Sequence, residues 1–168
     1  MSDESKKLYV EKLRFSFLNI ALGLLALVFL ISVSSQITDQ QMQGIENAMG
    51  ILLIMVILFL TYANFRILKI TVTNKIFEAR YGLIAKKIPL ETIKCARVHQ
   101  YKFTDFFGWG IRGSFDGTMA FNITGDKYQG VLLVYTNSKG KEKKFFASSK
   151  EPKKVLEVLK GQNNNIEI

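Results

Sequence analysis

The chain has 168 residues, of which 48% are hydrophobic and 22% charged, and its formal net charge at pH 7 is +9. This length suits one ordinary domain. The single cysteine, Cys95, excludes an intramolecular disulfide framework, and with the single histidine, His99, it argues against a metal centre built from cysteines and histidines.

Two long stretches near the start of the chain carry no charged residue. The first runs from Phe15 to Thr38 and the second from Asn47 to Phe65. Each is close to the roughly 20 residues that a helix needs to cross about 30 Å of hydrocarbon. Two buried helices in a water-soluble core are disfavoured, because about a hundred residues of half-polar sequence could hardly cover helices that are apolar all round. The pattern therefore predicts a transmembrane helical hairpin over 15–66, with spans at about 15–35 and 47–66.

Lysine and arginine are distributed unevenly around these stretches. The connector 34–46 has neither, whereas basic residues precede the first stretch (Lys6, Lys7, Lys12 and Arg14) and follow the second (Arg66, Lys69 and Lys75). Because positive charge accumulates on the cytoplasmic side of a membrane protein, segment 1–14 and the other end of the chain are both expected there. The predicted location is the inner cell membrane, crossed twice. Cleavage of the first stretch as a signal peptide near Val33–Ser35 is the alternative.

From Ile67 the hydrophobic period changes to that of β-strands. Strands are expected at 67–73, 76–81, 83–88, 93–103, 118–124, 130–136 and 142–148. A helix follows that begins near Ser148 or Ser149 and ends at Gly161, and 162–168 is expected to be a loose tail. An antiparallel sheet of this size has to curl or close to protect its edges, and a helix can plug one open end.

Several short segments resemble the bacterial pleckstrin-homology-like (PH-like) membrane proteins, in which two membrane spans precede a PH-like domain. The matching residues are Leu68–Thr73, Tyr81-Gly82-Leu83, Lys86–Ile93, Gly108–Arg112 and Ser149–Leu156, and the similarity covers Ile67–Leu159. The resemblance implies a fold and a position near the membrane, and no reaction. The expected fold class is thus an α+β membrane protein, in which the hairpin is followed at 67–161 by a cytoplasmic PH-like, seven-stranded, curled antiparallel β-barrel capped by a C-terminal helix.

The residues that could carry chemistry lack the partners that chemistry needs. Gly108–Gly113 spells the glycine pattern of a dinucleotide site, but the segment after it is β-like and position 133 holds leucine instead of an acid. His99 and Cys95 would share one face of a strand about two pleats apart, and a catalytic or metal site needs further groups. The sequence therefore predicts no catalytic residue, no cofactor and no metal, and the chain is not expected to be an enzyme.

The positive charge is concentrated in the second part of the chain. From Arg66 onward there are 19 Lys or Arg residues and nine Asp or Glu residues. Such a surface suits acidic lipid headgroups or nucleic acid, and the expected membrane tether favours the headgroups. The candidate binding residues are Arg97, Lys102, Trp109 and Arg112, in and around the glycine-rich stretch. In the competing interpretation the charge serves only topology and solubility, and Trp109 lies in the core or at the membrane interface.

The sequence thus predicts a membrane-anchored, non-enzymatic binding or scaffolding module whose ligand it does not identify. Its partners would be the lipid bilayer, in which it is integral, together with anionic headgroups, a protein segment or further copies of itself. One alternative is an accessory subunit whose spans pack with a partner. A small membrane enzyme or transporter would need convergent acid, base and nucleophile residues or ionisable groups in the spans, and the sequence shows neither.

Overall fold

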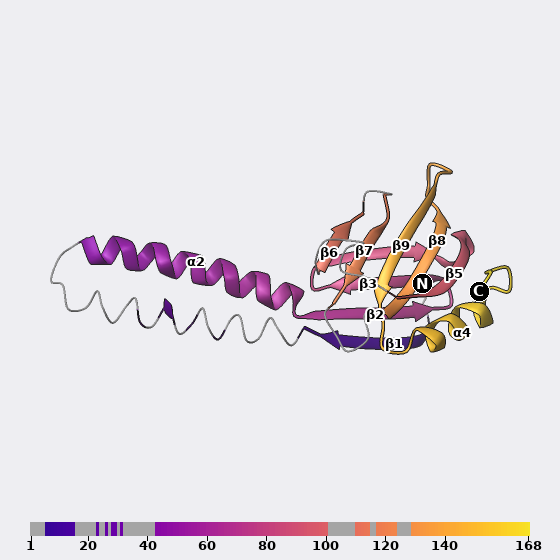
Figure 1. The fold of residues 1–168 in the computed structure, drawn as a ribbon, viewed down its shortest axis with the longest axis horizontal. Helices are drawn as coiled ribbons and strands as arrows, with labels where there is room; N and C mark the ends of the chain where they lie inside the picture. The colour runs from indigo at the N-terminus through magenta and orange to yellow at the C-terminus, as the bar shows by residue number, and fades with distance from the viewer. Residues whose placement is uncertain are drawn as a thin grey trace, which may run out of the picture. The chain divides into compact units, whose positions relative to one another are not determined.

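The computed structural model (Figure 1) describes residues 6–15, positions 23, 26, 28, 29 and 31, and residues 43–100, 110–114, 117–123 and 129–168. The chain forms two compact units. Phe15–Arg66 is one, and the residues before Phe15 join Ile67–Ile168 in the other. Segment 1–14, which the sequence analysis separated from the β domain, therefore belongs to the same unit as that domain.

The structure of the unit Phe15–Arg66 differs from the predicted membrane hairpin. It contains helix α2 (Gln43–Phe65). Within the described part of the chain, no helix combines the length and the apolarity that crossing a membrane requires. Three predictions are therefore wrong. They are the integral position in a lipid bilayer, the location in the inner membrane with two crossings, and the N-terminal helical hairpin.

The sequence of α2 gives a physical reason for this correction. Its first turns contain Gln43, Glu46 and Asn47, and its last turn contains Tyr62 and Asn64. The wholly apolar stretch between them, 48–60, covers roughly 20 Å at about 1.5 Å per residue, against about 30 Å of hydrocarbon. Counting only charged residues overestimated the apolar length.

The other unit contains a four-stranded antiparallel sheet in the order β1-β2-β3-β4. Its strands are β1 (Lys7–Arg14), β2 (Ile67–Thr73), β3 (Ile76–Tyr81) and β4 (Ile84–Pro89). The turn between β2 and β3 is held by the Thr73 hydroxyl, which accepts the N–H of Ile76 at 3.0 Å. Gly82, whose φ is 47°, makes the left-handed turn between β3 and β4.

The second sheet is mixed and has the order β5-β8-β9-β7-β6. Its strands are β5 (Ile93–Gln100), β6 (Gly110–Gly113), β7 (Met119–Asn122), β8 (Gln129–Thr136) and β9 (Glu142–Ser148), and a short 3₁₀ helix, Leu90–Thr92, leads into β5. Strands β7 and β9 are parallel, and the other neighbours are antiparallel. Among the described residues there are thus two open sheets with nine strands. The predicted seven-stranded, curled antiparallel β-barrel is therefore wrong.

The inner faces of the two sheets meet in an aromatic core. The ring of Phe145 on β9 lies edge-on to Phe77 on β3 and to Phe121 on β7, with ring centroids 6.3 and 5.3 Å apart. The hydroxyl of Tyr81 on β3 donates to the backbone carbonyl of Asn122 on β7 at 2.6 Å. Burial raises the pKa of Tyr81, so this hydroxyl keeps its proton as a donor at all ordinary pH values. These contacts tie the two sheets together.

Helix α4 (Pro152–Gln162) packs against β1, β2, β5 and β8 and buries Val155, Leu156 and Leu159. Its start is anchored by Glu11, on the inward side of β1. The Glu11 carboxylate accepts the hydroxyl of Ser149 at 2.6 Å and the N–H of Lys150 at 2.7 Å. This carboxylate from a distant strand therefore fixes the two residues that lead into α4, whose N-cap residue is Glu151.

The segment after α4 does not form the expected loose tail. The N–H of Glu167 donates to the carbonyl of Lys94 at 3.0 Å, and the N–H of Ala96 donates to the carbonyl of Glu167 at 2.8 Å. Ile166 is buried. The segment is therefore docked against the outer edge of β5.

We expect Glu11→Gln to destabilise this unit by about 1–3 kcal/mol, because the amide carries no charge and has one acceptor oxygen in place of the two that bind Ser149 and Lys150. The measurement is urea-induced unfolding of the whole chain, followed by circular dichroism. Glu157→Gln, on the exposed side of α4, is the matched control and should change stability by less than about 0.5 kcal/mol. Equal effects of the two substitutions would contradict the anchoring role of Glu11.

Candidate functional site

Two of the predicted site residues lie on the outer face of the five-stranded sheet. Arg97 is on β5 and Arg112 is on β6, and both side chains are exposed. The strand register places them at the two ends of one cross-strand row, in the order Arg97, Leu132, Phe146, Ala120, Arg112. Directly opposed residues point to the same side of a sheet, so both arginines face the same way.

The structure does not bring these two arginines together. Strands β5 and β6 are opposite edges of the sheet, and four strand spacings of about 4.8 Å separate the two positions by roughly 19 Å. The residues between them, Leu132, Phe146 and Ala120, form a buried apolar cluster. One small anion therefore cannot contact both arginines. Lys102 and Trp109, the other two predicted site residues, lie outside the described residues.

His99 takes part in aromatic packing on this same face. Its ring lies edge-on to that of Phe146, with centroids 5.8 Å apart. Gly130 is directly opposite His99, and a Cβ at this glycine would meet the Ala147 carbonyl oxygen and lie 2.8 Å from the Phe146 ring. The glycine thus makes room for the phenylalanine beside the histidine. Among the described residues, no three His, Cys, Asp or Glu side chains gather where they could hold a metal ion.

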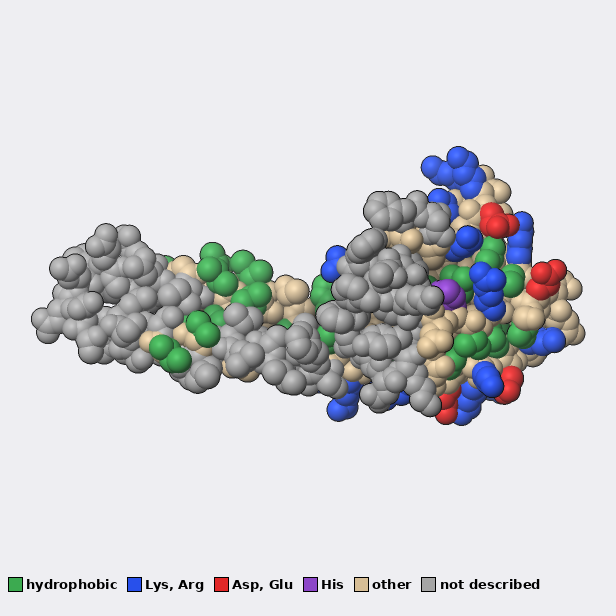
Figure 2. Space-filling model, viewed as in Figure 1, with side chains coloured by type: hydrophobic (Ala, Val, Ile, Leu, Met, Phe, Trp, Pro, Cys, Tyr) green, Lys and Arg blue, Asp and Glu red, His purple; other side chains and the backbone are tan. Residues whose placement is uncertain are grey.

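Among the described residues, the face of the β-sheet unit shown in Figure 2 has no continuous basic patch. Blue lysine and arginine side chains are dispersed there and red acidic side chains lie among them. Lys94 on β5, for example, pairs with Glu142 on β9 at 3.4 Å. A specific basic site has to be recognised from neighbouring positions in the sheet.

Such a set of neighbours occurs on the outer face of the four-stranded sheet. Lys12 on β1 is directly opposite Lys69 on β2, and Lys69 is directly opposite Arg80 on β3. Three cations therefore stand side by side on adjacent strands, with Cβ atoms about 5 Å apart. Arg14 and Lys87 point to the same side, as the alternation of the strands requires. We call these five residues, Lys12, Arg14, Lys69, Arg80 and Lys87, the basic face.

One carboxylate lies within the basic face. Glu78, on β3, binds Arg80 through contacts of 2.6 Å to Nη2 and 2.7 Å to Nε, and it lies directly opposite Lys87. Lys12 and Lys69 have no ion-pair partner within the described part of the chain. Like charges directly opposite each other destabilise a sheet, so this arrangement stores repulsion that an anion could relieve. The basic face was not predicted from the sequence, because residues 7–14 were not recognised as a strand.

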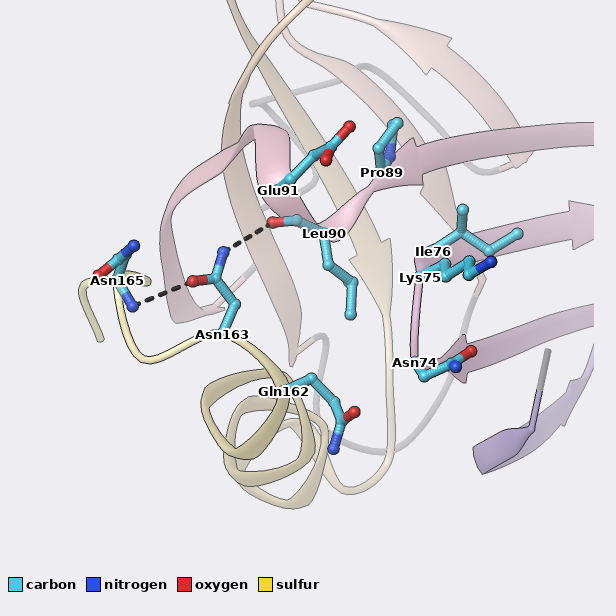
Figure 3. Close-up of a pocket in the computed structure, with 9 residues that line it drawn as sticks. All are labelled: Asn74, Lys75, Ile76, Pro89, Leu90, Glu91, Gln162, Asn163 and Asn165. Carbon is cyan, nitrogen blue, oxygen red and sulfur yellow. Dashed lines mark hydrogen bonds between the residues drawn. The ribbon is translucent and has the colours of Figure 1, made fainter.

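A separate groove of about 540 Å³ lies beside α4 (Figure 3). Its walls are the β2–β3 turn at 74–76, residues 89–91, and Gln162, Asn163 and Asn165. The Asn163 amide points to Leu90 and donates to its carbonyl at 3.1 Å, and its oxygen accepts the N–H of Asn165 at 3.1 Å. The lining offers amide donors and acceptors, and no nucleophile–base pair lies among its residues.

No protein-family model, curated protein or solved structure matches the chain. The resemblance to PH-like membrane proteins therefore stays a prediction from the sequence. The features that bear on function are the basic face, the two separated arginines and the groove.

Gly130→Ala tests the packing around His99. We expect it to destabilise the β unit by about 1–3 kcal/mol, because the added methyl group would displace Phe146 or the backbone of β9. Gly161→Ala is the matched control: it lies in α4, a Cβ there meets nothing within 4 Å, and the change should be neutral or stabilising. Thermal unfolding of both variants gives the comparison. No loss of stability in Gly130→Ala would show that this face rearranges freely.

Proposed function

We propose that this chain is a non-enzymatic binding module that captures an anionic ligand on the basic face. The observation that carries the proposal is the row Lys12–Lys69–Arg80 on three adjacent strands. Lysine and arginine supply charge and hydrogen-bond donors and no acceptors. They suit recognition of carboxylate or phosphate groups better than acid–base chemistry.

The geometry favours a ligand with more than one negative charge. Arg80 is already paired with Glu78, so a single small anion would find its free countercharge mainly between Lys12 and Lys69. A ligand with several anionic groups could also approach Arg14 and Lys87 at the two ends of the face. Binding would relieve the repulsion between the opposed cations, and this relief adds to the direct attraction.

The double substitution Lys12→Gln with Lys69→Gln tests the proposal. We expect it to weaken binding of a poly-glutamate peptide, and of tripolyphosphate, by about tenfold, which corresponds to about 1.4 kcal/mol. The double variant Lys153→Gln with Lys160→Gln removes the same charge from exposed positions of α4 and serves as the control. Fluorescence anisotropy for the peptide and calorimetry for the phosphate give the affinities at two salt concentrations.

Two further outcomes separate a specific site from diffuse charge. Equal losses in the two double variants would contradict the proposal and reduce the effect to net charge. Binding should also fall with added salt, because exposed charges are screened over about 8 Å at physiological ionic strength. The basic-face variant should be as stable as the native chain or slightly more so, because it removes two opposed like charges.

A further inference from the structure

Strand β5 is an edge strand of the five-stranded sheet, and a short piece of the same chain covers part of this edge. Edge strands present unpaired N–H and C=O groups that readily accept another strand. Glu167 pairs with these groups. Its N–H donates to the carbonyl of Lys94 and its carbonyl accepts the N–H of Ala96, which makes a parallel bridge opposite Cys95. The segment after α4 thus adds one strand-like position to the sheet.

One side chain of this segment, that of Ile166, is buried, and those of Asn165, Glu167 and Ile168 are exposed. Ile166 is only 3% exposed, whereas Ile168 is 56% exposed. One aliphatic side chain therefore enters the protein directly before the position that pairs with β5, and the next aliphatic side chain points outward. This pattern defines what the edge recognises: an extended backbone with an aliphatic residue at the buried position.

The attachment of the segment is local and small. Asn163 fixes its beginning through Leu90 and Asn165, as Figure 3 shows, and the N–H of Ile166 donates to the Asn163 carbonyl at 3.2 Å. Beyond this turn, two backbone hydrogen bonds hold the segment to β5. On its other side β5 pairs with β8 along its length, from Ile93 to Gln100. The segment is therefore much more weakly held than the ladder it extends.

The groove leaves open space next to the same segment. Gln162, Asn163 and Asn165 form one wall, and residues 89–91 form another. The 540 Å³ of this groove lies beside Asn163 and Asn165, at the beginning of the segment, and leaves space there for the segment to move. The amides that line it are suited to the backbone of an extended peptide.

We propose that the outer edge of β5 is a peptide-binding site that segment 163–168 occupies in the isolated chain. Its partner is an extended peptide that pairs parallel to β5 and places an aliphatic side chain where Ile166 lies. The partner's backbone replaces Glu167 in the bridge at Cys95, and its aliphatic side chain takes the buried position of Ile166. This site is distinct from the basic face and does not depend on the proposed anionic ligand.

The test uses a labelled peptide with the sequence of residues 162–168 and full-length variants of the chain. Ile166→Asp should release the segment and open the edge, whereas Ile168→Asp, at the exposed position, should leave it docked. The apparent affinity of the native chain is the intrinsic affinity multiplied by the open fraction, so we expect the Ile166→Asp chain to bind the peptide about two- to tenfold more tightly than the native chain. A peptide carrying the same Ile166→Asp change should bind none of the chains.

Equal peptide affinity in the native chain and the Ile166→Asp variant would overturn the proposal, as would a folded Ile166→Asp variant that binds no peptide. Binding of the altered peptide as tightly as the native one would also overturn it. Circular dichroism and unfolding curves establish that each variant is folded.

A measurement on the native chain keeps the proposal testable if Ile166→Asp does not fold. Amide hydrogen exchange at Glu167 and Ala96 should proceed through local opening, well before exchange in the β5–β8 ladder. Exchange of the Glu167 amide only at the rate of global unfolding would show a permanent part of the sheet, and would overturn the proposal.

Discussion

The pairing of β1 with β2 joins two parts of the chain that the whole unit Phe15–Arg66 separates. Arg14 lies opposite Ile67, and the N–H of Phe15 donates to the carbonyl of Arg66 at 2.9 Å. The chain thus leaves the β1–β2 ladder at Arg14 and returns to it at Ile67, directly opposite. Closing a long segment costs entropy, but the cost rises only slowly with its length. Once β1 is in place, alternation turns Glu11 inward to anchor α4 and Lys12 outward to face Lys69.

Local sequence patterns identify most of the strands after residue 66. They do not identify the order and pairing of those strands in the sheets. The expected strands at 67–73 and 76–81 coincide with β2 and β3, because their β-branched and alternating residues are characteristic without their neighbours. Strand β1 was not predicted, because half of its residues are charged and it lies directly before an apolar stretch. The parallel pairing of β7 with β9 depends on contacts between distant segments, which no local period encodes.

Predicting the candidate site requires the pairing register of the strands as well as their positions in the sequence. From the sequence, Arg97 and Arg112 look like members of one patch, but the order of the strands places them at opposite edges of a sheet. Lys12 and Lys69 look unrelated, since 15–66 lies between them, but they are direct neighbours. The membrane prediction was wrong for a different reason: charge-free sequence was counted as apolar, although α2 contains asparagine, glutamine, threonine and tyrosine near its ends.

The segment after α4 shows how close to balance one part of a stable sheet can lie. Each of its two backbone hydrogen bonds to β5 contributes about 1 kcal/mol net. Burial of Ile166 contributes about 2–3 kcal/mol. Ordering the backbone opposes this by about 1–2 kcal/mol for each residue fixed, and at least three residues are fixed between Asn164 and Glu167. Gain and cost are of similar size, so a partner that forms the same contacts and a few more suffices to shift the segment. The β5–β8 ladder, with paired residues along the whole strand, has no comparable weakness. Exchange at this edge can therefore proceed while the core that Tyr81, Phe121 and Phe145 form stays intact.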